Sequence, residues 1–95
     1  MVLTLDEKIQ YIAERELAAV IQKVHAPAGS VIVQDPNTGA ILALANWPKF
    51  NPNSATAVPT EARMDRAVSA IYEPGSTFKL VTLAAAFDQN LIRPE

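Results

Sequence analysis

Ser76 and Lys79 are the two residues of this sequence whose types and spacing could do chemistry. In a helix, positions three apart share one face, so the lysine amine would lie beside the serine hydroxyl. A serine becomes a useful nucleophile once a neighbouring base removes its proton. Desolvation by Phe78, Leu80 and Val81 would favour the neutral amine that such a base requires. The pair therefore predicts nucleophilic catalysis, with Ser76 as the nucleophile and Lys79 as the general base.

The residues around Ser76 suit its presentation at the start of a helix. Pro74 stops a preceding helix, and Gly75 allows a tight turn without a Cβ clash. The unpaired N–H groups and the positive dipole end of a helix start would face an oxyanion. In the alternative interpretation, Ser76 or Thr77 only caps the helix and Lys79 is solvated. The Ser-x-x-Lys spacing alone does not decide between the two.

The sequence before this motif predicts a scaffold that begins with a long helix. Thr4 and Glu7 have the spacing of a capping box, and residues 5–25 form an amphipathic helix with one apolar stripe. His25 is the only histidine, so we interpret it as a helix-end residue rather than a metal ligand or an acid–base group.

Two β-rich runs follow, at residues 30–35 and 40–46, and residues 35–39 form the turn of a hairpin. Both faces of these strands are apolar, so the sheet should be covered on two sides. We expect the helix of residues 5–25 on one face and the Ser76 helix on the other.

A long irregular segment, residues 47–75, separates the hairpin from the motif. Trp47 and Phe50 could stack on a ligand, although packing within the core or loop is the stronger interpretation. Residues 61–70 could form a short helix, and the last helix should span residues 76–89, with Asn90 at its left-handed C-terminal position.

Composition indicates one ordinary soluble domain. The 95 residues carry a net charge of −2, are 49% hydrophobic and include no cysteine. This charge gives no reason to expect nucleic-acid binding, and disulfides and cysteine-based metal sites are excluded. No apolar run approaches the roughly 20 residues of a membrane helix.

The string from Glu73 to Lys79, Glu-Pro-Gly-Ser-Thr-Phe-Lys, resembles the active-site motif of the class B, monofunctional penicillin-binding proteins. The similarity extends over residues 1–95, through Leu3–Asp6, Thr38–Ala43, residues 48–53 and Arg66–Val68. One departure is Asp65, which precedes Arg66 where the family commonly has asparagine.

The resemblance implies an α+β fold, the N-terminal part of a β-lactamase/transpeptidase-like domain. It also implies acyl transfer from the D-Ala-D-Ala end of a peptidoglycan stem peptide, trapping of β-lactams at Ser76, and no metal or organic cofactor. In the family, the Ser76 N–H would be half of an oxyanion hole, and a parent protein would be anchored in the cytoplasmic membrane with this domain outside.

The family's Ser-x-Asn and Lys-Thr-Gly elements are absent from the 95 residues. We therefore expect the chain alone to be inactive, and to form a homo-oligomer through an exposed sheet edge. The alternatives are a β-lactam sensor or β-lactamase relative, and a non-catalytic oligomerising module.

Overall fold

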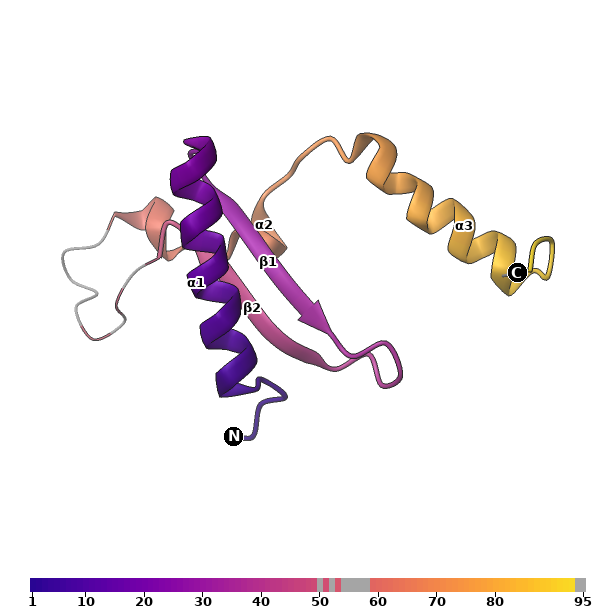
Figure 1. Cartoon of the computed structure of the whole chain (residues 1–95), viewed down its shortest axis with the longest axis horizontal. Helices are drawn as coiled ribbons and strands as arrows, with labels where there is room; N and C mark the ends of the chain where they lie inside the picture. The colour runs from indigo at the N-terminus through magenta and orange to yellow at the C-terminus, as the bar shows by residue number, and fades with distance from the viewer. Residues whose placement is uncertain (50, 52, 54–58, 94–95) are drawn as a thin grey trace.

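The computed structural model of the 95-residue chain describes residues 1–49, 51, 53 and 59–93. It confirms the α+β class, with helices and one two-stranded sheet (Figure 1). The elements in chain order are α1 (Glu7–Val24), β1 (Gly29–Gln34), β2 (Ile41–Trp47), a 3-10 helix (Thr60–Arg63), α2 (Arg66–Ser69), a second 3-10 helix (Gly75–Phe78) and α3 (Lys79–Asp88).

Helix α1 begins at Glu7 because Asp6 caps it. The Asp6 carboxylate accepts hydrogen bonds from the N–H groups of Lys8 and Ile9, at 2.9 and 3.0 Å. The predicted capping box at Thr4 is therefore wrong. The Thr4 hydroxyl instead donates to the Ile41 carbonyl at 2.6 Å, which draws the chain before α1 onto strand β2.

The other end of α1 is closed by His25. This residue adopts a left-handed conformation, with φ of 54°, and its N–H donates to the Ile21 carbonyl. The interpretation of His25 as a helix-end residue is confirmed.

Strands β1 and β2 form the predicted antiparallel hairpin. Val31 lies opposite Ala45 and Val33 opposite Ala43, and a β-bulge follows Val33. Gly39, with φ of 75°, takes the positive-φ position of the turn.

Asp35 organises that turn. Its carboxylate accepts from the Asn37 N–H at 2.8 Å and from the Thr38 hydroxyl at 2.9 Å. Both hydrogen bonds stabilise the ionised carboxylate and lower the pKa of Asp35 below its usual value. The bond from the Asn37 N–H has the larger effect, and the bond from the Thr38 hydroxyl has the next largest.

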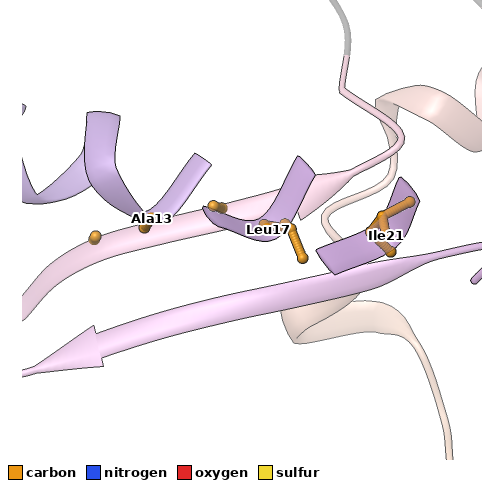
Figure 2. Close-up of a cluster of buried hydrophobic side chains, with 5 residues drawn as sticks. Ala13, Leu17 and Ile21 are labelled. Carbon is orange, nitrogen blue, oxygen red and sulfur yellow. The ribbon is translucent and has the colours of Figure 1, made fainter. Parts of the chain in front are cut away.

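The buried core lies between α1 and one face of the hairpin (Figure 2). It consists of Ala13, Leu17, Ile21, Ala43 and Ala45. Trp47 packs against this core, so the packing interpretation of this residue is confirmed, whereas Phe50 lies outside the described residues.

Gly29 lets β1 and α1 approach closely. A Cβ at this position would lie 3.1 Å from Ile21 Cδ1 and 3.2 Å from Leu17 Cδ1. The small residue is therefore needed for the layer spacing at the start of β1.

The opposite face of the hairpin is contacted by α2, and the expectation that the Ser76 helix covers it is wrong. Helix α3 extends away from the sheet (Figure 1). The chain consequently has a radius of gyration of 16.5 Å, against about 12 Å for a compact chain of this length. The extended stretch before Gly75 carries the last helix beyond the reach of the strands.

The predicted short helix at residues 61–70 is divided into the 3-10 helix Thr60–Arg63 and α2. Asp65 lies between them in an extended conformation and caps α2. The predicted left-handed position of Asn90 is confirmed, with φ of 55°. Among the described residues, no helix combines the length and apolarity needed to span a membrane.

Candidate active site

The candidate site lies where the extended chain turns into the last helix. Gly75 has φ of 53°, a conformation that L side chains rarely adopt, and a Cβ there would meet no atom within 4 Å. Glycine is thus required by the backbone turn rather than by crowding. Immediately after it, Gly75–Phe78 and α3 form one continuous helical run that carries Ser76 and Lys79.

Ser76 and Lys79 lie one turn apart at the start of this run. The Lys79 N–H donates to the Ser76 and Thr77 carbonyls, which fixes the backbone between the two side chains. Both side chains are exposed, and within the described residues no hydrogen bond joins them. The roles of Ser76 as nucleophile and Lys79 as base stay predictions.

The residues expected to desolvate the lysine are themselves exposed. Phe78, Leu80 and Val81 all belong to the exposed large hydrophobic residues. In the described part of the chain, Lys79 and these apolar neighbours are therefore not buried.

The start of the run is not capped by a side chain. The Thr77 hydroxyl donates back to the Pro74 carbonyl at 2.5 Å, and the Ser76 hydroxyl makes no hydrogen bond to a described residue. Neither Ser76 nor Thr77 therefore caps this helix, whereas the exposed Lys79 agrees with the solvated lysine of that alternative. Among the described residues the Ser76 N–H also has no acceptor, which leaves a backbone donor beside the Ser76 hydroxyl.

Asn46 joins the sheet to the segment that leads to the site. Its side-chain oxygen accepts from the Ser30 hydroxyl at 2.7 Å and from the Ala67 N–H at 3.1 Å. Its amide nitrogen donates to the Asp65 carboxylate at 2.9 Å. The network holds the start of α2 against both strands.

The same hydrogen-bond network includes Asp65, the residue that differs from the family's usual asparagine. Its carboxylate accepts from Asn46 and from the Ala67 N–H at 3.1 Å, so the aspartate at this position caps α2. Our sequence reasoning missed Asn46. The available signal was a polar residue within the apolar run Ile41–Trp47.

Comparison with known proteins decides the family. Residues 29–95 match the model of the penicillin binding protein transpeptidase domain. The chain belongs to this transpeptidase family. The resemblance inferred from the Glu73–Lys79 motif is confirmed.

Relatives in three organisms support the transpeptidase assignment. The chain is 37% identical over 93 residues to the peptidoglycan D,D-transpeptidase FtsI of Escherichia coli, covering 98% of the chain and 16% of that protein. It is 43% identical over 94 residues to the "Probable peptidoglycan D,D-transpeptidase PenA" of Neisseria flavescens, covering 99% and 24%. It is 39% identical over 93 residues to stage V sporulation protein D of Bacillus subtilis, covering 97% and 14%. The chain thus spans less than a quarter of the length of each of these three relatives.

Proposed function

We propose that Ser76 is the nucleophile of a peptidoglycan D,D-transpeptidase and that Lys79 is its general base. The observation that carries this proposal is the Ser76–Lys79 pair at an uncapped helix start, inside the region that matches the transpeptidase family. An uncapped start leaves backbone donors available for an oxyanion, and the pair supplies a hydroxyl and an amine one turn apart.

The reaction would be acyl transfer through a covalent intermediate. The Ser76 oxygen attacks the carbonyl carbon between the two D-alanines of a stem peptide, and the Lys79 amine takes the hydroxyl proton. The Ser76 N–H donates to the oxyanion. The C–N bond then breaks, and the terminal D-alanine leaves with the proton that Lys79 returns.

The second half of the reaction regenerates the serine. An amine of a neighbouring peptidoglycan strand attacks the Ser76 ester, a new amide forms, and the proton lost by the amine returns to the Ser76 oxygen. A β-lactam would be attacked at its ring carbonyl by the same serine and would remain bound as an ester. The site of this chemistry would lie outside the cytoplasmic membrane, where peptidoglycan is found, in a parent protein with a membrane anchor.

The 95-residue chain alone should lack this activity. The Ser-x-Asn and Lys-Thr-Gly elements, which supply a second oxyanion donor and the substrate-binding wall in such sites, are absent from the 95 residues. Loss of one oxyanion donor typically costs about 100- to 1000-fold in rate. The exposure of Lys79 and of its apolar neighbours is consistent with an incomplete site.

Labelling with a fluorescent penicillin, followed by denaturing electrophoresis, tests the proposal in two arms. The chain alone should remain unlabelled. Residues 1–95 joined to the remaining transpeptidase domain of the Escherichia coli relative should be labelled, and Ser76→Ala should abolish that labelling. Ser69→Ala, which changes the same side chain before the motif, is the matched control. A folded chimera, judged by a cooperative thermal transition, that is labelled equally with and without Ser76 would overturn the assignment.

The exposed apolar surface of α3 favours a second candidate, a non-catalytic module that associates with itself. Leu80, Val81, Leu83 and Phe87 are all exposed, together with Ile32 on the sheet. Such surface is commonly covered by another chain. We therefore propose that the isolated chain is a homo-oligomer. Sedimentation equilibrium tests this, and a monomer at all accessible concentrations would reject it.

A further inference from the structure

Asn46 lies on the face of the hairpin that α2 contacts. Side chains alternate along a strand, so the neighbours Ala45 and Asn46 point to opposite faces of the sheet. Ala45 is buried against α1, and Asn46 is therefore on the other face. Asn46 and Ser30 are opposite each other in the ladder, and the Ser30 hydroxyl donates to the Asn46 side-chain oxygen at 2.7 Å. This bond between the two strands orients the Asn46 amide group.

Asn46, Asp65 and the start of α2 form a closed cycle of hydrogen bonds. The Asn46 amide nitrogen donates to Asp65 Oδ1 at 2.9 Å. The Ala67 N–H donates to the same carboxylate oxygen and to Asn46 Oδ1, at 3.1 Å in each case. Each side chain therefore holds the other as well as the first turn of α2. The position of α2 on the sheet depends on both side chains together.

The cycle is chemically specific, because its two side chains have different hydrogen-bonding capacities. An amide offers donors and an acceptor, whereas an ionised carboxylate only accepts. Asn46 has to donate to Asp65 while its oxygen accepts two other hydrogen bonds. Two carboxylates at these positions would have no donor between them and would repel each other. An amide at position 65 could still accept from Asn46 and from Ala67.

The path of the chain after α2 connects this cycle to Ser76. Helix α2 has four residues, and so short a helix depends on external contacts for its form and place. Ala70 and Tyr72, which follow α2, line the same cavity as Ser30 of β1. The segment thus runs beside the sheet before Gly75 turns it into the helical run that carries Ser76, a path that can be followed in Figure 1. A displacement of α2 would change where this segment starts.

We propose that Asn46 and Asp65 are positioning residues for Ser76, and that they act as a matched pair of one amide and one carboxylate. This proposal rests on the assignment of Ser76 as the nucleophile, and it adds two residues outside the motif that set where the nucleophile lies. The pair fixes α2 on the sheet, and residues 70–74 carry that position to Ser76. Attack on a carbonyl depends steeply on placement, because an error of about 1 Å can cost about 100-fold in rate.

The test uses a folded chimera of residues 1–95 with the remaining transpeptidase domain of the Escherichia coli relative, and follows acylation by a fluorescent penicillin over time. Asn46→Asp should lower the rate constant at saturating penicillin about tenfold or more, because the two carboxylates repel each other and α2 shifts. The penicillin concentration that gives the half-maximal rate should change less than about threefold, because the contacts that bind penicillin are retained.

Exchanging the two side chains should rescue the reaction. The double variant Asn46→Asp with Asp65→Asn again has one amide to donate and one carboxylate to accept, and its net charge is that of the wild type. Its rate constant should return to within about threefold of the wild-type value. Asp65→Asn alone keeps the acceptor for Asn46 and for Ala67, so it should also remain within about threefold. A general loss of stability would not produce this pattern of one slow variant and one rescued variant.

Gln22→Glu is the matched control for the added charge. It makes the same change from amide to carboxylate on the exposed side of α1, and should leave the rate constant unchanged. A folded wild-type chimera that is not labelled at Ser76 would overturn the nucleophile assignment and the positioning proposal with it. Labelling at Ser76 that is as fast in Asn46→Asp as in the wild type, or as slow in the double variant as in Asn46→Asp, would overturn the positioning proposal alone.

Amide hydrogen exchange on the 95-residue chain provides a measurement that does not depend on the chimera. Exchange at the Ala67 amide should be about tenfold or more faster in Asn46→Asp than in the wild type, and should slow again in the double variant. The Leu44 amide, which donates to Gln10, should change less, because only global unfolding would expose both amides. Equal exchange at Ala67 in the three chains, or an equal change at Leu44, would contradict a role of the pair in holding α2.

Discussion

The segment from Asp6 to Trp47 and the segment from Tyr72 to Ile92 each contain a helix with apolar side chains. The helix of the second segment, α3, is the more apolar, yet only α1 in the first segment buries any of them. In the first, α1 packs Leu17 and Ile21 on the hairpin, and Gly29 allows the two layers to approach. In the second, α3 contacts the 3-10 turn that precedes it and buries none of its own residues. An apolar face therefore does not by itself make a packed helix, because a complementary surface must lie within reach of the chain.

The difference also separates stability from the proposed chemistry. The residues that hold the fold together lie before Trp47, whereas Ser76 and Lys79 lie on the helix that contributes no buried residue. Substitutions in the two segments should consequently affect different measurements. The predictions below refer to urea unfolding followed by circular dichroism at one fixed protein concentration, because self-association would shift the midpoint.

The largest contrast should come from truncating one leucine in each segment. Leu17→Ala should lower the free energy of unfolding by about 2–4 kcal/mol, because Leu17 is 8% exposed in a small core and the change leaves a cavity. Leu80→Ala should change it by less than about 0.5 kcal/mol, because Leu80 is 71% exposed. Equal costs at the two positions would show that α3 packs on the sheet in solution.

Asn46→Ala should have the next largest effect, about 1–2 kcal/mol, because it leaves Ser30, Asp65 and the Ala67 N–H without their shared partner. Amide exchange at Ala67 should accelerate as α2 loosens. Gln22→Ala, on the exposed side of α1, is the control and should change neither quantity. If Ala67 exchange is unaffected by Asn46→Ala, α2 is held by other contacts.

The helix cap provides a smaller effect. Asp6→Ala should cost about 1 kcal/mol, because the Lys8 and Ile9 N–H groups lose their acceptor. Asp88→Ala, at the end of α3, removes the same type of side chain and should change the unfolding free energy by less than about 0.5 kcal/mol. A greater loss for Asp88→Ala than for Asp6→Ala would reverse the assignment of stability to the first segment.

The smallest effect should be a pH dependence at the hairpin turn. The pKa of Asp35 is lowered by the Asn37 N–H and then by the Thr38 hydroxyl, so its contribution to stability is present above the unfolded-state pKa of about 4. That contribution is lost as pH falls through the lower, folded-state pKa.

Thermal midpoints of the wild type and of Asp35→Asn, measured from neutral pH down to strongly acid pH, should therefore converge as pH falls. If the difference between the two thermal midpoints stays constant over this pH range, the charge of the Asp35 carboxylate does not contribute to stability. Asp88→Asn provides a control in which one exposed carboxylate outside the turn is neutralised.

Local sequence signals were enough for the elements that depend on neighbouring residues. The apolar spacing of Ile9, Ala13 and Leu17 predicted α1, and the residues around Gly39 predicted the turn. The Glu73–Lys79 motif also indicated the transpeptidase family that the comparison later established. These features depend on dihedral preference and short-range spacing, which a sequence displays directly.

Only the tertiary structure showed where the remaining parts lie. Thr4 does not cap α1, because its hydroxyl donates to the Ile41 carbonyl on β2. Asn46 connects β1 and α2, because its side chain accepts hydrogen bonds from Ser30 and from Ala67. The face of the sheet opposite α1 is contacted by α2 and not by α3, because the extended residues 70–74 place α3 away from the sheet. The Gln10 side chain bonds to the backbone of Leu44 on β2, 34 residues away in the chain. Such outcomes depend on which distant groups meet in space, and the order of residues along the chain does not contain that information by itself.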